Sequence, residues 1–150
     1  MSILKQATKP ADRMPIVTIC GDSGLGKTSL AATFPNPIVI RAEDGLQGVP
    51  AAIRPDALPV VTSLEQLIEQ MTALYKEEHN YKTIIIDSVT ALERLFMQNV
   101  IDSDPKKPKS INQALGGYGA GLGAVATLHH RVGKLMSKIN ADKNIAIVYI

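Results

Sequence analysis

The sequence predicts an α/β fold in which helices cover both faces of a central parallel sheet. Short apolar runs of strand length alternate along the 150 residues with segments whose apolar residues recur every three or four positions. A glycine-rich stretch, Gly21–Thr28 (GDSGLGKT), follows the first apolar run and precedes a helix-compatible segment. Alternation of this kind produces parallel crossover units, because the chain must cross a face of the sheet between parallel strands. We therefore expect one domain, residues 15–150, behind an N-terminal tail, residues 1–14.

The first half of the chain contains two of the expected strands. Ile16–Cys20 (IVTIC) is a short apolar run that predicts a buried strand, and Ile38–Ile40 predicts a second strand buried on both faces. The helix after the glycine-rich stretch should end near Phe34, because the prolines that follow cannot continue it. Residues 48–58 contain one glycine and two prolines and have no clear period, which predicts a loop with at most one helical turn.

The second half contains three amphipathic helices and two further strands, expected at Tyr81–Asp87 and Asn144–Ile150. Ser63 and Gln66 form a capping-box pattern in front of the clearest helix. Residues 102–123 mix charge, proline and glycine, so we expect a mobile loop there without a packed element. The residues expected on the buried faces of the three helices are Leu64, Leu67, Ile68, Met71, Leu74 and Tyr75; Val89, Leu92, Leu95, Phe96 and Val100; and Val125, Leu128, Val132, Leu135, Met136 and Ile139.

Composition argues against several classes of protein. Aromatic residues make up 4% of the chain and tryptophan is absent, which argues against an aromatic platform for stacking bases. The net charge of +2 is too small to indicate a nucleic-acid partner without a local basic cluster. No apolar run approaches the length of a membrane span, and the N-terminus lacks an apolar signal core, so we expect a cytoplasmic protein without a membrane partner. The single Cys20 is expected to be a small buried apolar residue, and it excludes an intrachain disulfide.

The glycine-rich stretch matches the phosphate-binding pattern G-x-x-x-x-G-K-[ST] at every fixed position. Glycines let the backbone curl so that successive N–H groups and the N-terminus of the next helix point at one anion. Lys27 is expected to reach the β- and γ-phosphates of ATP, and Thr28 to offer its hydroxyl to Mg²⁺. The predicted nucleotide-binding residues are Gly21, Asp22, Ser23, Gly24, Leu25, Gly26, Lys27, Thr28 and Ser29.

Carboxylates follow two other predicted strands. Because ligands bind at the carboxyl edge of a parallel sheet, we expect Glu43, Asp44 and Asp87 to lie near the phosphate-binding loop. Asp87 follows four β-compatible residues and is predicted to hold Mg²⁺ directly or through water, and the alternative is a helix N-cap role for Asp87 or Ser88. Many ATPases place a glutamate directly after this aspartate, but Ser88 stands there. Glu43 is the best substitute for orienting or deprotonating the attacking water, and Asp44 is the less favoured neighbour.

Three segments, GDSGLGKT, VIRAEDGL and TIIIDSVTAL, together resemble the core of RecA-like recombination ATPases. They are most similar to phage-encoded RecA-like nucleotide-binding proteins associated with single-strand annealing and recombination, and the resemblance covers residues 14–150. It implies that Glu43 activates water and that Asp87 is the metal-linked aspartate. It also implies that Lys27 and Thr28 contact the phosphates and Mg²⁺.

The resemblance further implies a mobile, DNA-facing loop within residues 102–123. Lys106, Lys107 and Lys109 cluster there and could neutralise DNA phosphates without reading bases, while Tyr118 could stack on a base of single-stranded DNA. A solvated loop with no partner is the alternative. RecA-like proteins assemble into filaments or rings, so the resemblance implies a homo-oligomer.

The resemblance also implies a strand order of 2-3-4-1, counting the four expected strands along the chain. RecA-like cores normally continue beyond the strand that resembles residues 144–150, whereas this sequence stops at Ile150. We expect a C-terminally incomplete sheet whose first strand, Ile16–Cys20, is an apolar edge. On this expectation the sequence is a fragment or a partner covers the edge.

The expected function is that of an ATP-binding RecA-like ATPase in DNA recombination or single-strand annealing. A nucleotide-switched DNA-binding or assembly module with little hydrolysis is the first alternative. A small-molecule kinase is less favoured, because we find no acceptor-binding motif and Arg131 is the only arginine after Arg94. His129 and His130 are adjacent on the last helix and cannot share a face as a metal pair would.

Overall fold

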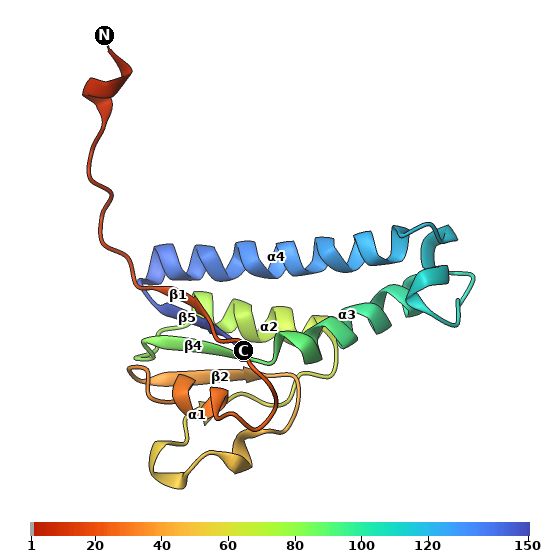
Figure 1. The fold of residues 1–150 in the computed structure, drawn as a ribbon, viewed down its shortest axis with the longest axis horizontal. Helices are drawn as coiled ribbons and strands as arrows, with labels where there is room; N and C mark the ends of the chain where they lie inside the picture. Colours follow the sequence, from red (N-terminus) through yellow and green to blue (C-terminus); the bar gives the residue numbers. More distant parts are fainter. Residues whose placement is uncertain (1) are drawn as a thin grey trace.

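In the computed structural model, which describes residues 2–150, five parallel strands form one sheet with helices on both faces (Figure 1). The strand order is β1-β5-β4-β2-β3, and every neighbouring pair is parallel. The strands are β1 (Ile16–Thr18), β2 (Pro37–Arg41), β3 (Asp56–Ala57), β4 (Thr83–Asp87) and β5 (Ala146–Tyr149). The helices are α1 (Lys27–Ala31), α2 (Leu64–Lys76), α3 (Val89–Ser103) and α4 (Ala120–Lys143).

The order differs from the expected four-strand order because it includes β3 at the edge beside β2. The other four strands follow one another as β2, β4, β5 and β1, which is the relative arrangement expected. The short strand β3 lies within residues 48–58, where the sequence predicts only a loop, so that prediction is wrong at this point. Both residues of β3 are exposed, and a two-residue exposed strand leaves no apolar pattern to detect.

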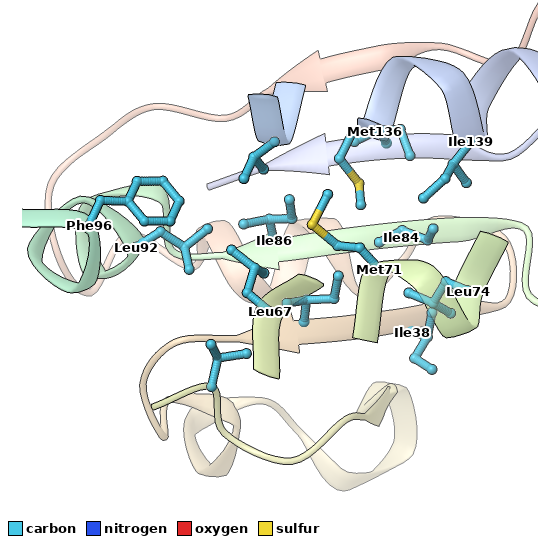
Figure 2. Close-up of a cluster of buried hydrophobic side chains, with 14 of the residues drawn as sticks. Ile38, Leu67, Met71, Leu74, Ile84, Ile86, Leu92, Phe96, Met136 and Ile139 are labelled. Carbon is cyan, nitrogen blue, oxygen red and sulfur yellow. The ribbon is translucent and has the colours of Figure 1, made fainter. Parts of the chain in front are cut away.

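Alternate residues of the central strands point to opposite faces of the sheet, and both faces are covered. One face carries Ile38, Ile40, Ile84, Ile86 and Ile147, which pack against α2, α3 and α4. Figure 2 shows this cluster, with Met71 of α2 and Met136 of α4 among the side chains that gather against the strands. The other face carries Val39, Ile85 and Val148, which pack against α1 and the residues after β2. Burial on both faces explains why these strands are continuous apolar runs.

Serine side chains cap the N-termini of two of the helices. The Ser63 side chain accepts a hydrogen bond from the Gln66 backbone N–H at 3.2 Å, as the capping pattern predicts. The Gln66 side chain instead reaches one residue further back, to the backbone N–H and hydroxyl of Thr62. Ser88 caps α3 in the same way, accepting from the Ala91 N–H at 3.2 Å. Each cap fixes the entry of its helix, because it satisfies a donor that the helix cannot pair internally.

Residues 102–123 contain more structure than the sequence predicts. A 3₁₀ helix, η4 (Ile111–Gly116), packs against α3 and α4, and α4 itself begins at Ala120. The buried Asp104 carboxylate accepts hydrogen bonds from the backbone N–H groups of Leu115 at 2.7 Å and Lys106 at 2.9 Å. These bonds, the Leu115 bond first, lower the pKa of Asp104. The prediction that this segment lacks a packed element is therefore wrong. The sequence does not reveal η4, because backbone hydrogen bonds to a single carboxylate leave no periodic pattern.

The first strand is less buried than expected. It pairs only with β5, and Ile16 is 47% exposed. Cys20, just beyond the strand, is exposed as well, so the prediction of a buried cysteine is wrong. The physical reason is the position of β1 at the edge of the sheet, where no further strand covers it.

The chain before β1 extends away from the body of the molecule (Figure 1) and contains a short exposed 3₁₀ helix, η1 (Ile3–Gln6). None of the helices within residues 2–150 combines the length and the apolar character that a membrane span requires.

Candidate functional site

The carboxyl edge of the sheet bears a cavity of about 980 Å³. Ile150 lies at this edge between β4 and α3, because its N–H donates to Ile86 and its carbonyl accepts from Val89 (Figure 1). The segments that follow β1, β2 and β4 converge on the cavity, as the sheet topology predicts. The residues that line it include Gly21, Asp22, Ser23, Gly24, Gly26, Lys27, Thr28, Ser29, Glu43, Asp87, Ser88, Thr90 and Arg94.

The phosphate-binding loop curls through glycines with positive φ. Gly24 and Gly26 both have φ +81°, a conformation that residues with a Cβ rarely adopt. Lys27 is the first residue of α1, and its Nζ donates to the carbonyls of Gly21 and Asp22 at 2.8 Å each. The ammonium group is therefore held within the curve of the loop. Leu25, predicted with this set, is 71% exposed and does not line the cavity.

A second contact joins the loop to the neighbouring strands. Thr28 Oγ1 donates a hydrogen bond of 2.7 Å to Asp87 Oδ2, although the two residues are 59 positions apart in the sequence. Both side chains are half-buried. The hydroxyl and the carboxylate are the two oxygen ligands that the sequence assigns to Mg²⁺, and the fold places them side by side.

The donor chemistry of this pair fits Mg²⁺. Magnesium prefers oxygen ligands and is usually held by one or two carboxylates together with substrate phosphates, not by a cage of protein groups. Within residues 2–150 no group of three or more His, Cys, Asp or Glu side chains could form such a cage. Thr28 and Asp87, beside a loop shaped for phosphates, are therefore a suitable protein contribution to a Mg²⁺–nucleotide site.

The two acids of the turn after β2 have different surroundings. Glu43 lines the cavity, and its Oε1 accepts a hydrogen bond of 2.9 Å from Ser88 Oγ. Asp44 does not line the cavity, and its carboxylate forms an ion pair of 2.9 Å with Arg41. The geometry therefore separates the two candidates for activating water and places only Glu43 toward the site.

The predicted DNA-binding residues lie apart from the cavity. Lys106, Lys107, Lys109 and Tyr118 are all exposed on the connection between α3 and α4. Figure 1 shows this connection at the ends of the two helices, beyond the sheet. Of the two histidines of α4, His129 contacts the Phe96 ring edge to face and His130 is exposed. Neither histidine takes part in the candidate site.

Ser88 and Arg94 are among the lining residues to which sequence reasoning gave no role in the site. The sequence indicates Ser88 as a departure from the glutamate found in many ATPases and as an alternative helix N-cap, and its hydroxyl also contacts Glu43. Arg94 lines the cavity on α3, and neither of the two ion pairs found in residues 2–150 involves it. The spacing could have revealed Arg94, because it lies four positions after Thr90 on α3 and residues four apart share one face of a helix.

A family model described as an AAA domain matches residues 13–150, which is nearly the whole chain. No curated protein matches the chain. The family match indicates a nucleotide-binding domain of the P-loop NTPase class, in agreement with the parallel sheet and the phosphate-binding loop. It does not distinguish the RecA-like type, which stays a prediction from the sequence motifs.

Proposed function

This chain belongs to the AAA domain family, and from that premise we propose that it is an ATP-binding ATPase with a RecA-like core that acts in DNA recombination or single-strand annealing. The motifs that resemble phage-encoded proteins of this kind support the narrower part of the proposal. The proposal has two parts, a nucleotide site and a DNA-facing segment, and they can be tested separately.

The contact between Thr28 and Asp87 is the observation that carries the nucleotide site. It brings the phosphate-binding loop and the end of β4 together at 2.7 Å, and Lys27 lines the same cavity as these two residues. An amine, a hydroxyl and a carboxylate at one edge of a parallel sheet are suited to a nucleotide triphosphate and its cation. A glycine-rich turn without a ligand would require neither the half-buried acid nor its alignment with Thr28.

ATP would bind with its phosphates in the curve of the loop, where Lys27 can exchange its two backbone carbonyl partners for phosphate oxygens. Mg²⁺, when bound, supplies positive charge that neutralises the phosphate oxygens. Thr28 and Asp87 are the residues that would hold it. The loop backbone and the N-terminus of α1 add N–H donors directed at the same anion.

Glu43 is the residue that would orient or deprotonate the attacking water. It is exposed to the cavity, so water can reach its carboxylate, and Ser88 holds that carboxylate by one oxygen. Asp44 is less suitable, because Arg41 pairs with its carboxylate outside the cavity. Glu43→Gln should therefore bind ATP with near-normal affinity and release phosphate at least about a hundredfold more slowly, the lower end of the usual contribution of a general base.

The exposed connection between α3 and α4 supports the DNA-binding part of the proposal. Lys106, Lys107 and Lys109 present three cations to solvent on this connection, and the ring of Tyr118 on the same connection is exposed as well. Such a surface suits the phosphates and bases of single-stranded DNA without sequence preference. Assembly of several copies into a filament or ring would place these connections along one strand.

A phosphate-release assay with and without single-stranded DNA tests the function. We expect turnover that depends on Lys27 and Glu43 and that rises when DNA is added. ATP binding with DNA affinity but no turnover would favour a nucleotide-switched DNA-binding or assembly module. No effect of DNA on turnover, and no change in DNA binding when the three lysines are replaced with alanine, would contradict the recombination role while leaving the ATPase in place.

A further inference from the structure

We propose that Ser88 is a positioning residue for hydrolysis, because its hydroxyl holds the Glu43 carboxylate in the orientation needed to act on water. This inference rests on the proposed ATPase function. It assigns a role to a side chain that does not itself need to touch the nucleotide.

The hydrogen bonds of the Ser88 hydroxyl fix its direction. The oxygen accepts from the Ala91 N–H at 3.2 Å, which caps α3. The hydroxyl has a single proton to donate, and it donates that proton to Glu43 Oε1 at 2.9 Å. A side chain held on one side by a helix cap loses little further freedom when it binds the carboxylate on the other side. Ser88 is therefore a preorganised donor.

The sheet register holds the two residues beside each other. β2 and β4 are neighbours, and Arg41 pairs with Asp87 at the ends of the two strands. The next step of the ladder continues past the strands, because the Ala42 N–H donates to the Asp87 carbonyl at 3.0 Å. Glu43 and Ser88 each follow a residue of this last pair. The backbone thus brings the two side chains together, and the hydroxyl fixes the remaining rotation of the carboxylate.

Within residues 2–150, Ser88 is the only side chain found in hydrogen-bond contact with the Glu43 carboxylate. An exposed glutamate without such a contact would sample many rotamers, and only some would face water beside the nucleotide. Many ATPases have their catalytic glutamate directly after the strand aspartate, whereas in this chain the acid and the residue that holds it follow two different strands. The acid comes from the turn after β2, and its holder comes from the position after Asp87.

Three substitutions of Ser88 separate positioning from helix capping. Ser88→Thr keeps both the cap and the donor, whereas Ser88→Ala removes both. Ser88→Gly removes the donor but remains an acceptable N-cap. If Ser88 positions Glu43, kcat for ATP hydrolysis should fall about ten- to a hundredfold in both the alanine and the glycine variants and be largely kept in the threonine variant. The ATP dissociation constant, measured by calorimetry, should stay within about twofold of the unchanged chain in all three.

A purely structural role predicts a different pattern. In that case activity would follow the urea unfolding midpoint, so that the glycine variant would be nearly as active as the threonine variant and only alanine would be impaired. This pattern would overturn the inference. Equal loss in alanine and glycine, with unfolding midpoints that differ between them, would support it.

Combination with Glu43→Gln completes the test. Ser88→Ala should add almost nothing in a Glu43→Gln background, because the base through which Ser88 acts is already absent. If Ser88→Ala leaves kcat unchanged while Glu43→Gln stops turnover, the positioning role is wrong and the ATPase assignment stands. If the unchanged chain releases no phosphate with or without single-stranded DNA, the ATPase assignment is wrong and the role of Ser88 falls with it.

Discussion

Replacing Lys27 with alanine should weaken ATP binding strongly without unfolding the protein. In this structure the Lys27 ammonium donates to two neutral carbonyls, those of Gly21 and Asp22, at 2.8 Å each. Phosphate oxygens carry full negative charge and attract an ammonium group more strongly than a carbonyl does. A hydrogen bond to a charged group contributes about 1.5 to 3 kcal/mol. Loss of one such contact therefore corresponds to a decrease in affinity of about 10- to 150-fold.

The same substitution should have little effect on the fold. Gly21 and Asp22 are both exposed, so water can replace the ammonium group at their carbonyls. Lys27 also contributes to neither of the buried hydrophobic clusters. The urea unfolding midpoint of the variant should therefore stay close to that of the unchanged chain, which separates loss of the site from loss of the structure.

Calorimetric titration with ATP in the presence of Mg²⁺ is the assay. Lys134→Ala is the matched control, because it removes the same charge from an exposed position on α4. The control should bind ATP as the unchanged chain does. An affinity of Lys27→Ala within about twofold of that of the control would refute the reasoning, because it would mean that the ammonium group makes no net contact with the phosphates.

Three further predictions concern the metal and the segment between α3 and α4. Thr28→Val removes the hydroxyl beside Asp87, so ATP affinity measured by calorimetry should fall in Mg²⁺ and stay unchanged in chelator; an equal loss in both would contradict a metal role. Because the folded-state pKa of Asp104 is lowered, the stability that its carboxylate contributes is present above the ordinary carboxyl pKa of about 4 and is lost as the pH falls below it. Asp104→Asn should therefore flatten the dependence of the urea unfolding midpoint on pH between about 3 and 7. An unchanged pH dependence would mean that Asp104 does not contribute to it. Gly121→Ala would bring a Cβ into collision with the Ile111 carbonyl oxygen and should lower the free energy of unfolding by about 1 to 3 kcal/mol, whereas Gly123→Ala, whose Cβ would meet nothing within 4 Å on the same helix, should not be destabilising.

The parts of the site that could be predicted from the sequence are those with a local cause. The phosphate-binding loop depends on glycines at positions of positive φ and on a lysine and a threonine at the start of a helix, all within one short stretch. Asp87 and Glu43 follow apolar runs, and in a parallel sheet the ends of such runs meet at one edge. Local pattern and topology were therefore enough to predict that these residues meet, and they line the same cavity.

The parts that could not be predicted depend on contacts without a periodic signal. The segment around η4 is held by two backbone N–H groups that donate to the Asp104 carboxylate. No spacing rule distinguishes this acid from its exposed neighbour Asp102. The same is true of the bond between Ser88 and Glu43, which joins residues 45 positions apart. The exposure of Cys20 follows from which strand lies at the edge of the sheet, and an apolar run looks the same at an edge as at the centre.

The hydrophobic core and the site are linked through the register of β2 against β4. Strand residues rise about 3.3 Å each, so a slip of one position would move Glu43 from Ser88 by more than the length of their hydrogen bond. The slip would also turn Val39 to the face that Ile38 and Ile40 now occupy, and it would exchange every side chain of β2 between the two faces of the sheet. Because Val39 and Ile40 are both completely buried, on opposite faces, both clusters resist this exchange. The packing of the central strands therefore sets the position of the Glu43 carboxylate, to which we assign a role in hydrolysis.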